Sequence, residues 1–295
     1  MRVFITGATG FIGTALTKEL LAHGHSVLGL SRSDAGSAAL KAAGADVHPG
    51  SLEDPETLKS GAQQADAVAH LAFNHDFTRY QQNCEDDRVA IEAIGSVLIG
   101  TNKPLLITSG TAMARSENGP STEDMPAPPS SMVPRAASEE AALALAAKGV
   151  RASIVRLPQV HDTTKFGLVS PFIMTAQAKG YLAYVGEGNQ RWPAAHVSDV
   201  ARLYRLALEK AESGAVYNAV GEEGVTHRDI CEALSPRLNI PVRVITEAEI
   251  PDYFGPFAMF ANLDLPASSE KTQKRLRWHP NGPTMIEDLK QFVPA

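Results

Sequence analysis

The chain has 295 residues, which is enough for one large domain or two closely associated ones. Hydrophobic residues make up 44% of the chain and charged residues 20%, close to the averages of folded proteins, so a disordered, collagen-like or coiled-coil protein is excluded. The 27 Lys and Arg against 33 Asp and Glu give a net charge of −6, without a basic block that would neutralise phosphates, so we expect no nucleic-acid partner.

The first half of the chain alternates short strand-like runs with longer helix-like stretches. Strands are expected at residues 3–6, 27–30, 45–48, 67–73, 105–109 and 152–157, and helices at 14–23, 35–43, 88–98 and 138–147. Strand, helix, strand alternation requires parallel pairing, and apolar runs buried on both faces are typical of a parallel sheet between two helical layers. The sequence therefore predicts an α/β fold with a doubly wound parallel sheet.

The alternation loosens after Pro158, where a stretch containing glycines and aromatic residues covers 166–190. It recovers with a helix at 198–210 and a strand at 215–219, and then come a helix at 228–238, a strand at 242–245, a segment rich in Pro and Phe at 251–266 and a helix at 269–276. We predict a dinucleotide-binding domain of residues 1–165 with 191–220, and a smaller substrate-binding lobe of 166–190 with 221–295. Residues 125–134 are expected to form a surface loop.

A glycine-rich turn, residues 6–13 with the sequence TGATGFIG, follows the first strand and opens the first helix. In a dinucleotide-binding turn Gly7 permits the tight bend, Gly10 lets the backbone approach a pyrophosphate, and Gly13 lets the helix pack closely on the sheet. The free N–H groups of the helix would then face the phosphates. The expected contacts are Gly7, Thr9, Gly10, Phe11, Ile12 and Gly13; an ordinary strand-to-helix turn is the alternative.

The turn, together with four later motifs, resembles the extended short-chain dehydrogenase/reductases, the group that contains sugar-nucleotide epimerases and dehydratases. The later motifs are His70-Leu71-Ala72, Thr108-Ser109, Arg156-Leu157-Pro158 and the run HVSDVA at 196–201. The resemblance implies a Rossmann-type fold with a C-terminal substrate lobe, an NAD(P) cofactor and pairing into a homodimer. It also implies cofactor contacts at Leu52, Leu71, Ala72, Phe73, Arg135, Leu157, Pro158 and Val160.

The end of the second strand bears on the choice of cofactor. An NAD site usually has Asp or Glu there to accept hydrogen bonds from the ribose hydroxyls. This chain instead has Ser31, Arg32 and Ser33, and a guanidinium with two hydroxyls suits the 2′-phosphate of NADP. NADP is therefore favoured over NAD, although Asp34 follows directly and Arg32 is also compatible with a solvated loop arginine.

The Tyr-x-x-x-Lys pair of ordinary short-chain dehydrogenases is absent from its expected place. None of the six tyrosines lies between Thr108 and Arg156, and the only lysine in that interval is Lys148. Counting back from Arg156 places Ser131 at the tyrosine position and Arg135 at the lysine position. An arginine suits the ribose hydroxyls, whereas serine is a poor acid, so the chain is interpreted as an atypical member of the group.

Replacement catalytic groups are sought at the ends of strands. Ser109 and Thr111 lie at the carboxyl end of the fifth strand, where ligands bind in open α/β sheets, although capping of the turn is the alternative role. His75 follows the fourth strand and titrates near neutrality, which suits an acid or base, although a loop histidine that only forms hydrogen bonds is the alternative. Asp76 is interpreted as a helix cap.

Further residues are interpreted more simply. His161 is expected to be a solvated loop histidine and His196 a structural residue at the sheet edge. Arg191-Trp192-Pro193, with Phe166, Phe257 and Met259, would wall a substrate pocket or serve as packing.

The two cysteines, Cys84 and Cys231, have no spacing typical of zinc ligands or of a disulfide framework, so we expect no metal and a reducing cytoplasmic location. The chain contains no apolar run of about 18 residues, and its N-terminus begins with a strand-like pattern, so neither membrane insertion nor export is expected.

Three functions remain open from the sequence. The first is an NADP-dependent oxidoreductase that acts on a carbonyl or alcohol of a small organic substrate. The second is an epimerase or dehydratase that uses the bound nucleotide as an internal redox shuttle, and it depends on the missing tyrosine. The third is a non-enzymatic NADP-binding redox sensor. Net oxidation of NADPH, turnover without net oxidation, and binding without turnover distinguish the three.

Overall fold

The computed structural model describes residues 1–116 and 118–294, so Glu117 and Ala295 lie outside the description. Its centre is a seven-stranded sheet with the order β10-β6-β5-β4-β1-β2-β3, parallel at every pairing, which confirms the predicted α/β class. The strands are β1 (Arg2–Thr6), β2 (Ser26–Ser31), β3 (Asp46–Pro49), β4 (Ala67–His70), β5 (Pro104–Gly110), β6 (Arg151–Leu157) and β10 (Val216–Asn218). The strand order reverses between β1 and β4, so the ligand site of such a sheet is expected at their carboxyl ends.

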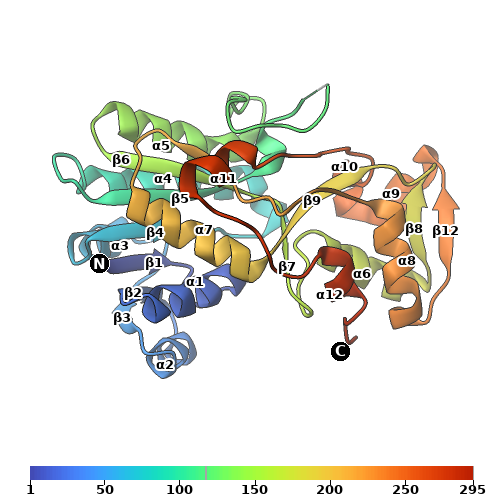
Figure 1. Ribbon diagram of the computed structural model, residues 1–295, viewed down its shortest axis with the longest axis horizontal. Helices are drawn as coiled ribbons and strands as arrows, with labels where there is room; N and C mark the ends of the chain where they lie inside the picture. The colour runs from blue at the N-terminus through green and yellow to red at the C-terminus, as the bar shows by residue number, and fades with distance from the viewer. Residues whose placement is uncertain (117, 295) are drawn as a thin grey trace.

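Helices cover both faces of this sheet (Figure 1). One layer consists of α1 (Phe11–Ala22), α2 (Asp34–Ala42) and α7 (Val197–Lys210), and the other of α3 (Pro55–Gln63), α4 (Tyr80–Ser96) and α5 (Ala137–Ala147). Neighbouring residues of β1 show why two layers form. Val3 and Ile5 belong to the core under the first layer, and Phe4 belongs to the core under the second, because successive side chains of a strand point to opposite faces.

The smaller lobe has a core of its own. Its helices are α6 (Val169–Lys179), α8 (His227–Leu238), α9 (Ile250–Phe254), α10 (Ala258–Ala261) and α12 (Met285–Leu289), and its strands β8 (Leu182–Val185) and β12 (Val242–Ile245) pair in parallel. A three-stranded sheet of β11 (Glu222–Thr226), β9 (Arg191–His196) and β7 (Gln159–His161) connects it to the larger lobe. The remaining short 3₁₀ helices are η1 (Phe77–Arg79), η2 (Thr111–Met113), η3 (Pro134–Ala136), η4 (Glu247–Glu249) and η5 (Gly255–Phe257).

The boundary between the lobes differs from the predicted one in two places. Strand β9 pairs with β11 and β7 and takes no part in the seven-stranded sheet. Helix α11 (Glu270–Leu276) returns to the larger lobe, where Figure 1 shows it in red beside α7. Trp278, two residues later, belongs to the core of that lobe. The buried Trp278 indole donates to the Asp199 carbonyl at 2.9 Å, and this burial of a large apolar ring explains the return.

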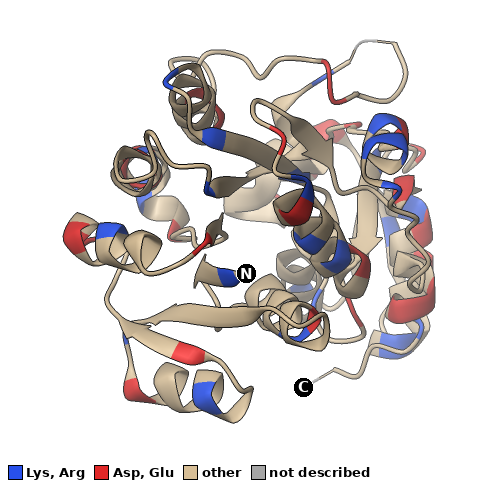
Figure 2. Ribbon diagram, turned by 60° about the vertical axis from the view of Figure 1, so that its left-hand side comes forward, with Lys and Arg blue, Asp and Glu red and all other residues tan. Residues whose placement is uncertain are grey.

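Charged residues are distributed over the whole molecule. Figure 2 shows Lys and Arg interspersed with Asp and Glu along the helices. Among the described residues no helix is both long enough and apolar enough to cross a bilayer.

Candidate functional site

The glycine turn has the geometry that a closely approaching ligand requires. Gly7 has a φ of +71°, in the left-handed region, and a Cβ there would lie 2.9 Å from the Ala72 nitrogen. A Cβ on Gly13 would lie 2.1 Å from the Gly7 carbonyl oxygen, far inside contact distance. Gly10 donates its N–H to the Gly7 carbonyl at 2.9 Å and closes the turn. Larger side chains are therefore excluded at Gly7 and Gly13 by the backbone itself.

The N-terminus of α1 is prepared for an anion. Its N-cap is Gly10, which offers no side-chain acceptor, and its first turn contains no acidic residue. The first amides of the helix are thus left for a phosphate. Thr9 and Gly10 are exposed, and Phe11 and Ile12 are half-buried.

Lys165 was not predicted as part of this site. It lies in the connection after β7, and its Nζ is 5.6 Å from the centre of the Phe11 ring. Its side chain is exposed, so a cation stands beside the free helix N-terminus. Lys165 is separated from the turn by 151 residues of sequence, so no local pattern could have identified it.

The end of β2 is without a carboxylate, as its sequence indicates. The buried Ser31 hydroxyl donates to the Ser33 carbonyl at 3.0 Å. The Ser33 hydroxyl accepts the Gly36 N–H at 3.2 Å and so caps α2, while Arg32 is exposed beside it. Asp34 is the first residue of α2 and is also exposed. The guanidinium of Arg32 is therefore free to meet an anionic group next to this strand end.

Strand β4 ends at His70, three residues earlier than predicted, because the register with β1 and β5 stops there. Leu71, Ala72 and Phe73 form the half-buried connection that follows. The buried His70 ring makes contacts on both sides, at 2.8 Å to the Thr6 hydroxyl and 2.9 Å to Asp87. His70 thus ties the strand that carries the glycine turn to α4.

Arg135 lies at the same edge of the sheet. It donates to Asp87 at 3.0 Å and to the Thr108 carbonyl at 2.9 Å, and its guanidinium lies 4.3 Å from the centre of the Phe73 ring. Burial alone would raise the pKa of Asp87, but the hydrogen bonds and charges of His70 and Arg135 outweigh it and hold that pKa below its usual value. The residue at the predicted lysine position is therefore oriented at the strand ends, whereas Ser131 is exposed on the preceding loop.

Ser109 and Thr111 have different surroundings. The Ser109 hydroxyl is buried and donates to Glu139 at 2.7 Å. Glu139 in turn holds Arg156 through two hydrogen bonds of 2.8 and 2.7 Å. The hydroxyl of Thr111 has only a long contact of 3.4 Å with the Leu157 carbonyl. The Ser109 proton is therefore engaged in a buried ion-pair network, and the Thr111 proton is nearly uncommitted.

An aromatic cluster of five residues adjoins Arg135. It consists of Phe73, His75, Phe77, Tyr80 and Phe257, linked by ring distances of 5.3 to 6.5 Å. Partial removal from water lowers the pKa of His75 below 6.5, and the charge of Arg135 acts in the same direction, although the ring keeps contact with solvent. Burial raises the pKa of Tyr80 to about 12. Tyr80 is therefore a phenol near the site, although it lies outside the interval in which a Tyr-x-x-x-Lys pair is expected.

The other predicted cofactor contacts lie around this edge. Leu52 is half-buried before α3, Leu157 ends β6, and Pro158 is buried directly after it. Val160 is only 6% exposed and packs in the core beneath α7. Its side chain therefore offers little surface to a cofactor.

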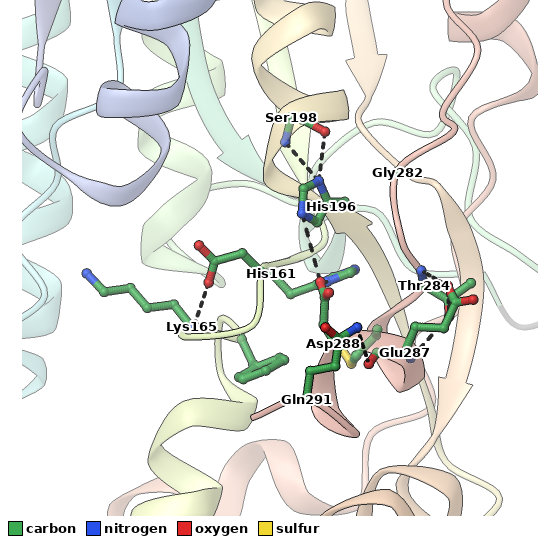
Figure 3. A network of polar contacts seen from close by, with 12 residues as sticks. His161, Lys165, His196, Ser198, Gly282, Thr284, Glu287, Asp288 and Gln291 are labelled. Carbon is green, nitrogen blue, oxygen red and sulfur yellow. Dashed lines mark hydrogen bonds and ion pairs between the residues drawn. The ribbon is translucent and has the colours of Figure 1, made fainter. Parts of the chain in front are cut away.

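The prediction that His161 is solvated is wrong. His161 is fully buried, and its Nδ1 lies 2.7 Å from the buried Asp288 of α12. His196 caps α7 by accepting the Ser198 N–H at 3.3 Å, and its Nε2 is 3.9 Å from the same carboxylate (Figure 3). Burial lowers the pKa of His161. Asp288 thus joins β7, the start of α7 and α12, and this cluster holds the two lobes together.

The predicted pocket wall is corrected in part. Phe166 is fully buried and Trp192 is 1% exposed, so both belong to the core of the smaller lobe. Arg191 is paired with Asp264 at 2.7 Å. Phe257 and Met259 remain at the surface, and Met259 is 67% exposed.

In the part of the chain that the structure describes, no group of three or more His, Cys, Asp or Glu side chains is placed to bind a metal ion.

A glycine cradle at the point where the strand order of a parallel sheet reverses, followed by a free helix N-terminus, defines a Rossmann-type dinucleotide-binding protein. The chain matches the NAD dependent epimerase/dehydratase family over residues 3–220. The protein belongs to this family, whose members are NAD(P)-dependent enzymes.

Two similar proteins from yeasts cover the whole chain. An uncharacterized protein of Schizosaccharomyces pombe is 46% identical over 292 residues, and one of Saccharomyces cerevisiae is 43% identical over 293 residues, with 98% of each chain covered in both cases. Among solved structures, dTDP-glucose 4,6-dehydratase of Bacillus anthracis in complex with NAD superposes with a TM-score of 0.77 at 16% identity, covering 99% of this chain and 95% of that one. The last likeness concerns the fold alone.

Proposed function

We propose that the protein is an NADP-dependent oxidoreductase of the atypical short-chain dehydrogenase/reductase type, with a carbonyl or alcohol of a small organic molecule as substrate. The observation that carries the proposal is the glycine cradle at the strand reversal beside a β2 end that presents Arg32 in place of a carboxylate. Membership of an NAD(P)-dependent family supports it.

Several residues would hold the cofactor. The α1 amides and Lys165 would meet the pyrophosphate, since Gly7 and Gly13 leave the space that a Cβ would fill. Arg32 and Ser33 would meet the 2′-phosphate, and Arg135 the nicotinamide ribose. When bound, the nicotinamide supplies or accepts a hydride.

We assign the transfer of the proton to and from the substrate oxygen to His75. Because its pKa lies below 6.5, His75 is mainly neutral at about pH 7 and accepts a proton from an alcohol during oxidation. During reduction it must first be protonated, so a reduction that depends on His75 accelerates as the pH falls through this pKa.

The substrate oxygen requires a hydrogen-bond donor while it gains negative charge. Thr111 supplies this donor in our proposal, because its hydroxyl has only a long contact at the end of β5. Ser109 stabilises the end of β5 by donating a hydrogen bond to Glu139, which also binds Arg156.

Oxidation of NADPH in the presence of a panel of aldehydes and ketones tests the proposal. We expect turnover with at least one of them, a rate that rises below about pH 6.5, and loss of this acidic rise in His75→Gln. Substitution of His23, an exposed histidine directly after α1, by Gln is the matched control. Binding of NADPH without any turnover would contradict the oxidoreductase and favour the redox sensor, and substrate conversion without net oxidation would favour the shuttle.

A further inference from the structure

We propose that the substrate of this site is a neutral carbonyl compound with a flat apolar group, and not a nucleotide-diphosphate sugar. This inference rests on the proposed oxidoreductase function and deepens it. In the reductive direction the carbonyl carbon gains a hydride and its oxygen a proton, so the C=O double bond becomes a C–OH single bond while NADPH is oxidised to NADP.

The aromatic cluster brings flat apolar groups from both lobes beside the predicted nicotinamide site. Phe73 lies under Arg135, which links the cluster to the ends of β4 and β5. At its other end the Phe77 ring meets Phe257 of η5 edge to face, with ring centres 5.8 Å apart. The chain connection after β4 and the smaller lobe are thus joined by aromatic side chains.

The cluster is accessible as well as apolar. Phe77 is 41% exposed, and Met259, two residues beyond Phe257, is 67% exposed. Rings that are fixed by neighbouring rings on one side and open on the other suit stacking with a planar ligand group.

The charge around the cluster is unsuitable for a diphosphate. The segment 247–266, which carries Phe257 and Met259, contains four acidic residues and neither Lys nor Arg. The segment 71–87, which carries the other four members of the cluster, contains one cation, Arg79, against four acidic residues. Three of these carboxylates, Glu85, Asp87 and Asp264, are paired with arginines. The other five still outnumber Arg79, so a ligand with two phosphates would meet an excess of negative charge in these segments.

Three basic residues that contact segment 247–266 or the aromatic cluster are already engaged. Arg191 donates to both oxygens of Asp264 at 3.0 and 2.7 Å, and Lys179 donates to the Asp252 carbonyl at 3.0 Å. Arg135 is held by Asp87 and the Thr108 carbonyl. Among the described residues, these three cations would have to give up existing partners before they could bind a sugar-nucleotide diphosphate.

Calorimetric titration of the full chain, saturated with NADP⁺ so that no reduction occurs, tests the inference. The probes are 2-naphthaldehyde and dTDP-glucose, and the variants are Phe77→Ala and Phe257→Ala. We expect 2-naphthaldehyde to bind and each variant to weaken it about five- to tenfold, because each removes one stacking face. Val244→Ala, at an apolar side chain 61% exposed on β12, is the control and is expected to change nothing.

A nucleotide titration separates this inference from the proposed function. The dissociation constant of NADPH is expected to be the same in the wild type and in all three variants. Failure of the wild type to bind NADPH would overturn the oxidoreductase itself, and the substrate class with it. If NADPH binds, the substrate class is overturned by tighter binding of dTDP-glucose than of 2-naphthaldehyde, by absence of aldehyde binding, or by equal aldehyde binding in Phe77→Ala and Phe257→Ala.

Discussion

The glycine turn and the aromatic cluster adjoin the same edge of the sheet but are built in different ways. The turn occupies eight consecutive residues and presents backbone amides, whose positions are fixed by the absence of Cβ atoms at Gly7 and Gly13. The cluster combines side chains of residues 73–80 with Phe257 from the other lobe. Backbone recognition suits a cofactor whose phosphates are always the same, whereas side chains from two lobes suit a substrate that differs from enzyme to enzyme.

The interiors of the two lobes differ too. Near the turn, buried polar groups form closed networks, such as the one from Thr6 through His70 to Asp87. In the smaller lobe, the buried Trp192 Nε1 and His227 Nε2 have no partner among the described residues. Both residues line a cavity of about 20 Å³, room for about one water molecule. Protonation of the buried His227 is therefore expected to destabilise the smaller lobe in acid.

The largest effect is expected from Gly13→Ala, which alters the glycine turn. Its Cβ would lie 2.1 Å from the Gly7 carbonyl oxygen, so the turn must open. We expect at least about a hundredfold loss of NADPH affinity, measured by fluorescence titration. Gly100→Ala, at a φ of +75° with no atom near its Cβ, is the control and should retain full affinity. Unchanged binding in Gly13→Ala would show that the cofactor does not use this turn.

The pH dependence of the protein's stability tests the smaller lobe. Burial lowers the pKa of His227 to about 4, against 6.5 when unfolded, so below pH 6.5 the unfolded chain binds a proton that the folded chain does not. The free energy of unfolding therefore falls with the pH, by about 3 kcal/mol between pH 6.5 and 4. Guanidinium unfolding of His227→Gln should show a loss smaller by this amount, and an identical loss in both proteins would refute the assignment.

The cofactor preference offers a smaller effect. Arg32→Ala removes the exposed guanidinium at the end of β2. We expect the dissociation constant of NADPH to rise about tenfold and that of NADH to stay within about twofold, because only NADPH carries the 2′-phosphate. Arg243→Ala, in the smaller lobe, is the control. Equal weakening of NADPH and NADH binding would mean that Arg32 contacts the adenine that both nucleotides share, or that it is only a surface residue.

The smallest effect separates Ser109 from Thr111. Ser109→Ala removes a donor to Glu139, and we expect a loss of about 1.5 kcal/mol in unfolding free energy with nearly unchanged turnover. Thr111→Val should lower kcat/KM about tenfold while stability changes little. The reverse pattern, with turnover lost in Ser109→Ala alone, would make Ser109 the donor to the substrate.

The parts of the fold encoded by local patterns could be predicted from the sequence. Apolar runs that lie before Pro158 predicted six of the seven strands of the main sheet. The spacing of Gly7, Gly10 and Gly13 predicted the cradle. The end of β4 was placed too late because residues 71–73 are as apolar as the strand, and only the ladder with β1 and β5 decides where pairing stops.

Contacts between distant segments could not be predicted in this way. Lys165 beside Phe11, Phe257 against Phe77, and Asp288 beneath His161 each join residues far apart in sequence. The position of Arg135 could be predicted from its sequence distance to Arg156, but its contact with Phe73 is visible only in the structure. Such pairs are determined by how the lobes pack, which no periodicity of 2 or 3.6 residues records.

The most direct test of the account is a comparison of NADPH and NADH binding to the purified protein by fluorescence titration. The account predicts saturable binding of both reduced nucleotides, with NADPH about tenfold tighter, since Arg32 and Ser33 stand where a carboxylate would select NADH. Tighter binding of NADH would contradict the cofactor assignment, and binding of neither nucleotide would contradict the role of the glycine turn on which the proposed function depends.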